Sequence, residues 1–171
     1  MLSGDLDEYK IQKLIEKGAK VDLFGVGTRM STSADSPYVD IVYKLVEIKR
    51  NGKMQPIAKL SPEKVTLPSK KQVYRRISND GIFESDIIAE ENEKLEGIPL
   101  LSIVVKDGKR VRERETLEQT KSYIKKQIDS LSEEIKRIRE PATYKVEVSD
   151  FLKAKLAEEQ SKIKIRNKIS I

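Results

Sequence analysis

Asp22-Leu23-Phe24-Gly25-Val26-Gly27-Thr28-Arg29 is the stretch of this sequence that decides its fold. A short apolar strand runs directly into two glycines that are one residue apart, and a threonine follows them. Because glycine has no Cβ, Gly25 and Gly27 are expected to take positive φ and to let an anion approach the backbone N–H groups. The Thr28 hydroxyl adds a donor, and a helix that begins just after Arg29 would attract the same anion. The stretch therefore predicts a phosphate-binding loop, with a plain strand-to-helix turn as the alternative.

The residues before this loop predict one β-α-β step. Residues 1–4 have the character of a strand end and its turn, and Asp5 with Glu8 three residues later can cap the helix that follows. Gly18 ends this helix, and residues 21–24 form the next short strand. This order is typical of a parallel sheet or barrel, which needs more strands than these. Residues 1–36 are therefore predicted to be the last β-α-β step of a larger α/β unit, which is either a parallel sheet or a barrel.

A β-rich hairpin region is predicted for residues 37–112, because short β-prone runs alternate with turn residues. The turns are Asn51-Gly52, Asn79-Asp80-Gly81 and Asp107-Gly108. Asn-Gly and Asp-Gly pairs favour two-residue hairpin turns. The strands expected around these turns cover residues 41–48, 57–60, 71–77, 82–88 and 100–105.

The last part, residues 113–171, is predicted to hold C-terminal helices and a basic tail. Apolar residues from Leu117 to Ile138 recur at steps of seven, four, three, four and three, which predicts one or two amphipathic helices over residues 115–139. Pro141 stops this pattern. Residues 144–148 then alternate as a strand, and Ser149 can cap a last helix.

The composition removes several classes of site. The 171 residues include no cysteine, which excludes disulfides, thiolate metal sites and cysteine nucleophiles. They also include no histidine, so the commonest general base and metal ligand are missing, and neither a catalytic residue nor a metal site is assigned. No apolar run approaches the roughly 18 to 20 residues of a membrane helix, and the N-terminus has no secretory signal. We therefore expect a cytoplasmic protein with no membrane partner.

The net charge of +6 raises the question of nucleic-acid binding, so its distribution matters. Residues 1–48 hold six basic and eight acidic side chains, whereas residues 161–171 hold four basic and no acidic ones. Most of the excess is thus a basic tail, which is usually a solvated chain end. Nucleic acid is therefore not the partner that the sequence favours.

Four blocks of this sequence occur in the order seen in nicotinate phosphoribosyltransferases, and the chain resembles this family. The blocks are Ser-Gly-Asp-Leu-Asp-Glu-Tyr at residues 3–9, Phe-Gly-Val-Gly-Thr at 24–28, Val-Tyr-Lys-Leu-Val-Glu-Ile at 42–48, and Lys-Val-Thr-Leu-Pro-Ser-Lys-Lys-Gln-Val-Tyr-Arg at 64–75. The resemblance is densest over residues 3–75 and continues more loosely through the amphipathic helix and residues 139–149. Four ordered blocks are far more specific than the glycine loop alone.

The resemblance implies the C-terminal part of an α/β barrel-like phosphoribosyltransferase domain, followed by a β-rich segment with C-terminal helices. In this family the β-rich domain is built from both ends of the chain. The implied reaction joins nicotinate to phosphoribosyl pyrophosphate, with coupled ATP hydrolysis, and gives nicotinate mononucleotide and pyrophosphate in NAD salvage. Nicotinate and phosphoribosyl pyrophosphate are thus the implied substrates, and Mg²⁺ and ATP are the implied cofactors.

The resemblance also implies a phosphate- and phosphoribosyl-binding set of residues. The set is Ser3, Gly4, Asp5, Gly25, Gly27 and Thr28. Backbone N–H groups of the two loop glycines and the Thr28 hydroxyl would hold the 5-phosphate, and Ser3 with Gly4 would form the neighbouring wall. Such a site works mainly by holding the donor in line and countering its charge.

Several charged residues near these blocks have two interpretations. Asp5 and Asp7 could orient ribose hydroxyls or a Mg²⁺ ion through water, or they could simply be acids at a helix N-terminus. Lys44, Lys70 and Lys71 could meet phosphate oxygens, although lysines at strand edges are more often solvated.

The sequence also departs from the family. The upstream half that supplies most nicotinate contacts and a phosphorylated histidine has no counterpart here, and the chain has no histidine. We therefore expect the chain to be inactive alone and to associate with itself or with an N-terminal half. It would be a fragment, a subunit of a split enzyme or a truncated gene product. A quinolinate- or nicotinamide-type relative, and a noncatalytic binding module that uses the basic tail, are the alternative functions.

Overall fold

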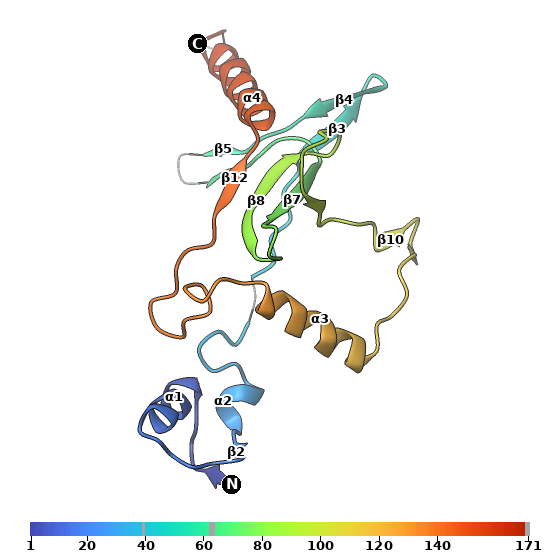
Figure 1. Ribbon diagram of the computed structural model, residues 1–171. Helices are drawn as coiled ribbons and strands as arrows, with labels where there is room; N and C mark the ends of the chain where they lie inside the picture. Colours follow the sequence, from blue (N-terminus) through green and yellow to red (C-terminus); the bar gives the residue numbers. More distant parts are fainter. Residues whose placement is uncertain (39, 62–63, 170–171) are drawn as a thin grey trace. The chain divides into compact units, whose positions relative to one another are not determined.

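The computed structural model describes residues 1–38, 40–61 and 64–169. These residues form two compact units. The first unit comprises Met1–Tyr43 together with Ile138–Glu140, and the second comprises the described residues of Lys44–Arg137 and Pro141–Ile171. Figure 1 shows the helices and strands of both units.

The first unit is built on one β-α-β step (Figure 1). Strand β1 (Leu2–Ser3) leads into helix α1 (Glu8–Glu16), and strand β2 (Phe24–Gly25) leads into the short helix α2 (Thr28–Ser31). The two strands pair in parallel, with Leu2 opposite Phe24 and Ser3 opposite Gly25. The predicted β-α-β step is confirmed. Its second strand is Phe24–Gly25 and not residues 21–24, because these are the two residues that pair with β1.

Helix α1 begins two residues later than expected. Its N-cap is Asp7, which has extended backbone angles and accepts a hydrogen bond from the Lys10 backbone N–H on Oδ1 at 2.8 Å. The predicted cap at Asp5 is wrong, because Asp5 has a φ of 45° and belongs to the turn before the helix. Gly18 has a φ of 77° and ends the helix, as predicted.

The second unit is organised around a mixed four-stranded sheet with the spatial order β12-β8-β7-β9 (Figure 1). Strands β7 (Lys71–Ile77) and β8 (Phe83–Glu90) form the predicted antiparallel hairpin. Strand β9 (Ile98–Pro99) pairs antiparallel with β7, and β12 (Val146–Val148) pairs in parallel with β8. The inner strands are therefore neighbours in the sequence, whereas β12 comes from the last part of the chain.

Three smaller antiparallel hairpins accompany this sheet. They are β3 (Glu47–Arg50) with β4 (Lys53–Pro56), β5 (Leu60–Ser61) with β6 (Lys64–Val65), and β10 (Val105–Lys106) with β11 (Lys109–Arg110). The β3–β4 and β10–β11 turns are Asn51-Gly52 and Asp107-Gly108, and all four residues have φ between 49° and 78°. Both predicted two-residue turns are thus confirmed.

Two helices follow the strands. Helix α3 (Leu117–Asp129) begins with a capping box, in which Thr116 Oγ1 accepts from the Gln119 N–H and Gln119 Oε1 accepts from the Thr116 N–H. It ends at Asp129 with Ser130 as its C-cap, so it is shorter than the expected 115–139. Helix α4 (Asp150–Ile169) begins after Ser149, whose Oγ accepts from the Leu152 N–H at 3.1 Å and confirms the predicted cap.

The apolar core of the second unit lies where α4 packs on β8. Ala89 and Leu152 are completely buried, and Phe83 and Ile87 are nearly so. Burying a leucine side chain contributes about 2 kcal/mol, so this contact anchors α4 through Leu152. In residues 1–38, 40–61 and 64–169, no helix has both the length and the apolar character that a membrane crossing requires.

Three predicted strands differ from the structure. Only the last two residues of the expected strand 41–48 belong to β3. Of the expected strand 100–105, only Val105 belongs to a strand, β10, and β9 lies just before it at Ile98–Pro99. The expected strand 57–60 does not form: β4 ends at Pro56, and β5 begins at Leu60. A strand needs a neighbour for its ladder hydrogen bonds, and the described residues provide none for residues 41–45 or 101–103. The chain is a mixed α/β protein with small sheets and C-terminal helices, and the barrel-like arrangement stays a prediction.

Candidate functional site

The carboxyl ends of β1 and β2 bring the two halves of the predicted site together. Because the strands are parallel and Ser3 lies opposite Gly25, the turn at Gly4 and Asp5 and the loop that starts at Val26 leave the same edge of the pair. This edge is where α/β proteins commonly bind ligands. All six predicted residues therefore lie at one end of the first unit, although their binding of phosphate stays a prediction.

The two loop glycines differ from the expectation and from each other. Gly25 and Gly27 do not have positive φ, and Gly27 has φ −108° and ψ −112°. A Cβ on Gly25 would lie 3.1 Å from the Ser3 Cβ, so this glycine permits close approach of the two strands. A Cβ on Gly27 would meet nothing within 4 Å, so the space beside it is open. The positive φ angles at this edge belong instead to Gly4 (125°) and Asp5 (45°), in the turn that follows β1.

Helix α2 begins at Thr28, directly after its N-cap Gly27. The Met30 and Ser31 N–H groups both donate to the Gly27 carbonyl at 3.1 Å. The N–H groups at the very start of a helix have no intrahelical acceptor. The exposed Thr28 thus lies at the start of one helical turn, with its hydroxyl available at the surface of the first unit.

A group of charges surrounds this loop, and it includes two residues, Lys10 and Arg29, that the predicted site does not contain. Lys10 Nζ donates to Asp5 Oδ2 at 2.9 Å and to the Asp5 carbonyl at 2.5 Å. Arg29 Nε lies 3.8 Å from Asp5 Oδ1 and 3.7 Å from Asp7 Oδ2. The hydrogen bond from Lys10, with the positive charges of Lys10 and Arg29, lowers the pKa of Asp5. Because Arg29 directly follows the loop in the sequence, its presence beside the loop could have been predicted.

The two aspartates therefore differ in what they can do. Asp7 is buried and caps α1, which confirms the helix N-terminal interpretation for this residue. Asp5 is exposed, and its carboxylate is held by Lys10. Of the two, only Asp5 presents a carboxylate to solvent beside the loop.

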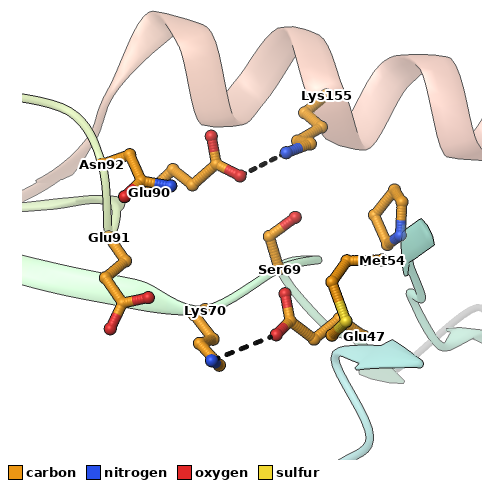
Figure 2. A pocket seen from close by; sticks show the side chains of 9 residues that line it. Glu47, Met54, Ser69, Lys70, Glu90, Glu91, Asn92 and Lys155 are labelled. Carbon is orange, nitrogen blue, oxygen red and sulfur yellow. Dashed lines mark hydrogen bonds and ion pairs between the residues drawn. The ribbon is translucent and has the colours of Figure 1, made fainter. Parts of the chain in front are cut away.

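The second unit contains a separate cavity of about 220 Å³ (Figure 2). It is lined by Glu47, Met54, Pro56, Ser69, Lys70, Glu90, Glu91, Asn92 and Lys155. Lys70 Nζ lies 3.6 Å from Glu47 Oε1, and Lys155 forms an ion pair with Glu90 across the other side of the cavity. Both lysines of this cavity are thus paired with carboxylates.

Lys71 also has a structural role. Its ammonium group donates to the carbonyls of Leu67 and Ser69 at 2.8 and 2.5 Å, and burial lowers its pKa. Lys44 is exposed. The contacts of Lys70 and Lys71 are therefore with the protein itself, so neither is free to serve as a phosphate ligand without giving up a described partner.

A cluster around Asp86 joins distant parts of the second unit. Arg75 Nε and Nη2 donate to the two Asp86 carboxylate oxygens at 2.8 Å, and Tyr144 Oη donates to Oδ1 at 2.9 Å. Arg75 Nη1 also donates to Gln127 on α3, and its guanidinium lies 4.3 Å from the Phe83 ring centroid. The hydrogen bonds from Arg75 lower the pKa of Asp86, and burial raises the pKa of Tyr144 to about 12. Every member has a partner, so the cluster is structural.

The described residues do not form a metal cage. Among residues 1–38, 40–61 and 64–169, no group of three or more acidic side chains is arranged to hold a metal ion. Mg²⁺ prefers near-octahedral oxygen ligands and is commonly held by one or two carboxylates together with substrate phosphates. Asp5 is the described carboxylate that fits such a partial role, because it is exposed beside the loop.

Comparison with known proteins identifies the relatives of this chain. Residues 94–156 match the sequence profile of the nicotinate phosphoribosyltransferase C-terminal domain. Nicotinate phosphoribosyltransferase pncB2 of Mycobacterium tuberculosis is 36% identical over 157 residues, a match that covers 91% of this chain and 33% of that protein. The nicotinate phosphoribosyltransferase of Bacillus subtilis is 33% identical over 86% of this chain and 36% of its own length.

A solved structure gives the same relationship at the level of the fold. The crystal structure of human nicotinic acid phosphoribosyltransferase superimposes with a TM-score of 0.66 at 22% identity, over 91% of this chain and 32% of that chain. The chain spans about a third of the length of the curated relatives that it matches. These findings confirm the relationship predicted from the four sequence blocks: the chain is homologous to the C-terminal portion of nicotinate phosphoribosyltransferase.

Proposed function

We propose that this chain is the phosphoribosyl-binding C-terminal portion of a nicotinate phosphoribosyltransferase. The complete enzyme would join nicotinate to phosphoribosyl pyrophosphate, with ATP hydrolysis, and give nicotinate mononucleotide for NAD salvage. The observation that carries this proposal is the parallel pairing of β1 with β2, which places residues 3–5 and 25–28 at one edge in a chain with these relatives.

In this proposal the loop holds the 5-phosphate of the donor. The open space beside Gly27 admits an anion, the first N–H groups of α2 donate to it, and the Thr28 hydroxyl adds a further donor. Ser3 and Gly4 form the neighbouring wall. The donor's C1 gains oxocarbenium-like character as pyrophosphate leaves, so holding the donor in line is the main contribution of these residues.

Asp5 and Arg29 extend this arrangement to the rest of the donor. Arg29 places a positive charge beside the loop, and the exposed carboxylate of Asp5, held by Lys10, can orient ribose hydroxyls. Mg²⁺ would neutralise charge on the pyrophosphate when bound. Of the two aspartates at this edge, Asp5 would be the one able to bind the ion, because Asp7 caps α1.

The named relatives favour nicotinate as the base over quinolinate or nicotinamide. The base-selecting residues of the proposed enzyme would lie in the part that this chain does not cover. We propose that the chain alone forms no product, because a phosphate cradle without a base pocket holds only one end of the donor.

An assay with radiolabelled nicotinate tests this function. The chain, the portion of the M. tuberculosis relative that it does not cover, and a mixture of the two are each supplied with phosphoribosyl pyrophosphate, ATP and Mg²⁺. Nicotinate mononucleotide is expected from the mixture alone. Product from this chain alone, or no product from a mixture that has formed a complex, would contradict the proposal.

A further inference from the structure

We infer that the cavity of the second unit is a binding site for a small zwitterion, an aliphatic α-amino acid (Figure 2). Glu47 and Ser69 hold the ammonium group of this ligand, and Lys70 holds its carboxylate. The cavity shares no residue with the phosphate loop of the first unit, so the inference does not depend on the proposed function.

Ser69 presents a hydroxyl group to this cavity. The residue is only 3% exposed, and its side chain points between the two ion pairs of the cavity (Figure 2). Its main chain is fully occupied, because its N–H donates to the Val46 carbonyl and its carbonyl accepts from the Lys71 ammonium group. In the part of the chain that the structure describes, its hydroxyl has no hydrogen-bond partner. Buried hydroxyl groups are usually hydrogen-bonded, so this one indicates a polar group inside the cavity.

The backbone at Ser69 indicates that its side chain has a function. Ser69 has a φ of 63°, in the left-handed region that glycine adopts most easily. A serine in this conformation carries strain that a glycine would avoid, and such residues cluster at ligand sites. The hydroxyl group is what distinguishes Ser69 from the glycine that would fit this backbone best.

Glu47 provides a carboxylate that lacks a close donor. Its side chain is 18% exposed, and its ion pair within the described residues is with Lys70, at 3.6 Å. This separation is too long for a good hydrogen bond. The Lys70 side chain is 62% exposed, so its ammonium group keeps donors for a ligand. Glu90 and Lys155, in contrast, pair closely, so the Lys70–Glu47 pair is the one open to a ligand.

A zwitterion complements this open pair on both sides. An ammonium group has three donors and can serve the Glu47 carboxylate and the Ser69 hydroxyl together. The ligand carboxylate then accepts from Lys70, and each of the four charges faces an opposite one. An anion bound at Lys70 would face Glu47, and a cation bound at Glu47 would face Lys70, so a single charge meets repulsion in either case.

The size and the apolar lining of the cavity indicate the class of zwitterion. Its volume of about 220 Å³ lies below the roughly 300 Å³ at which sites for drug-sized ligands begin, so it suits a ligand as small as an amino acid. Met54 and Pro56 of β4 supply its apolar side, which suits an aliphatic side chain. Among the described residues the acidic side chains are not arranged to hold a metal ion, which favours an organic ammonium group.

The experiment titrates L-valine into the full chain and follows the backbone amide signals by NMR. Shifts are expected at residues 69–70 and 90–92, with a dissociation constant below about 1 mM. Isobutylamine lacks the carboxylate of valine, and isovalerate lacks its amine. Each should bind at least tenfold more weakly than valine. Nicotinate should also bind at least tenfold more weakly, because it has no ammonium group.

Ser69→Gly is the decisive variant, because it removes the hydroxyl group and relieves the backbone strain together. It is expected to unfold at the same or a higher temperature than the wild type but to bind valine at least tenfold more weakly. Ser33→Gly is the matched control, because Ser33 also has a positive φ, of 46°, and is an exposed residue of the first unit. It should bind valine as the wild type does. Glu47→Gln should weaken binding at least tenfold.

Several results would overturn the inference. They are the absence of amide shifts at about 10 mM valine, and wild-type affinity in Ser69→Gly or Glu47→Gln. Isobutylamine binding as tightly as valine would make the cavity a site for simple cations. Equal binding of isovalerate or nicotinate would make it an anion site, and both results contradict a site for zwitterions.

Discussion

Replacing Asp86 with asparagine tests how much of the second unit's stability depends on one ion pair. Both Asp86 oxygens accept hydrogen bonds from the Arg75 guanidinium, and the two side chains are only 12% and 19% exposed. Arg75 is also held against the Phe83 ring, so it cannot easily turn to solvent when its partner changes. The variant therefore leaves a largely buried guanidinium without its carboxylate.

The magnitude follows from this burial. Removing one partner of a buried ion pair costs about 3 to 5 kcal/mol, and we expect a value near 3 kcal/mol here because both groups keep some access to water. Lys125 and Asp129 provide the matched comparison, because they also lie 2.8 Å apart but are 75% and 61% exposed. Asp129→Asn should cost no more than about 0.5 kcal/mol.

Native-state hydrogen exchange of the β7–β8 amides measures both effects. The free energy of opening of this hairpin should fall by about 3 kcal/mol in Asp86→Asn and stay almost unchanged in Asp129→Asn. The lowered pKa of Asp86 gives a second check with a defined sign. Its contribution is present above the ordinary pKa of 3.8 and is lost as the pH falls below it, so acid should weaken the wild type more than the variant. Equal losses in the two variants would refute the reasoning.

Three further predictions concern single positions. Burial raises the pKa of Tyr144 from 10.0 to about 12, so urea titrations should show stability falling as the pH rises from 10 to 12, by about 2 kcal/mol or less, and Tyr144→Phe should remove this part of the loss. Gly27→Val should leave the first unit folded but weaken phosphoribosyl pyrophosphate binding in the assembled enzyme by about 2 kcal/mol, as measured by calorimetry. Gly25→Val should instead separate β1 from β2, which circular dichroism would detect. Unchanged affinity in Gly27→Val would mean that the loop is a plain turn. Gly97→Ala should cost about 3 kcal/mol in thermal unfolding, because Gly97 has a φ of 126° and its Cβ would lie 2.7 Å from the Arg75 carbonyl oxygen; a loss below about 1 kcal/mol would contradict this.

Local features of the fold could be predicted from the sequence because their causes are local. Asn51-Gly52 forms its turn through φ angles that few other pairs adopt, and Ser149 caps α4 through an acceptor three residues from its donor. The N-cap of α1 is harder to predict from the sequence, because the carboxylates of Asp5 and Asp7 can both accept a hydrogen bond from a helix N–H group. The positive φ at Asp5, which decides between them, depends on the turn out of β1.

Pairing between distant segments could not be predicted in the same way. Residues 41–45 and 101–103 have strand-forming side chains, yet a strand depends on a neighbour that sequence propensity does not supply. The same holds for the candidate site. The glycine loop was found from its pattern, but the place of Arg29 between two aspartates depends on how β1 pairs with β2.

The parallel pairing of β12 with β8 has a consequence for the order in which the sheet assembles. Arg75 and Asp86 are 11 residues apart across the β7–β8 hairpin, whereas Tyr144, at the entrance to β12, is 58 residues from Asp86. Loop-closure entropy grows as (3/2)RT ln n, so bringing in β12 costs about 1.5 kcal/mol more than closing the hairpin. During synthesis the hairpin can form long before Val146 leaves the ribosome. One edge of β8 then stays without its neighbour until the residues around Val146 have been made.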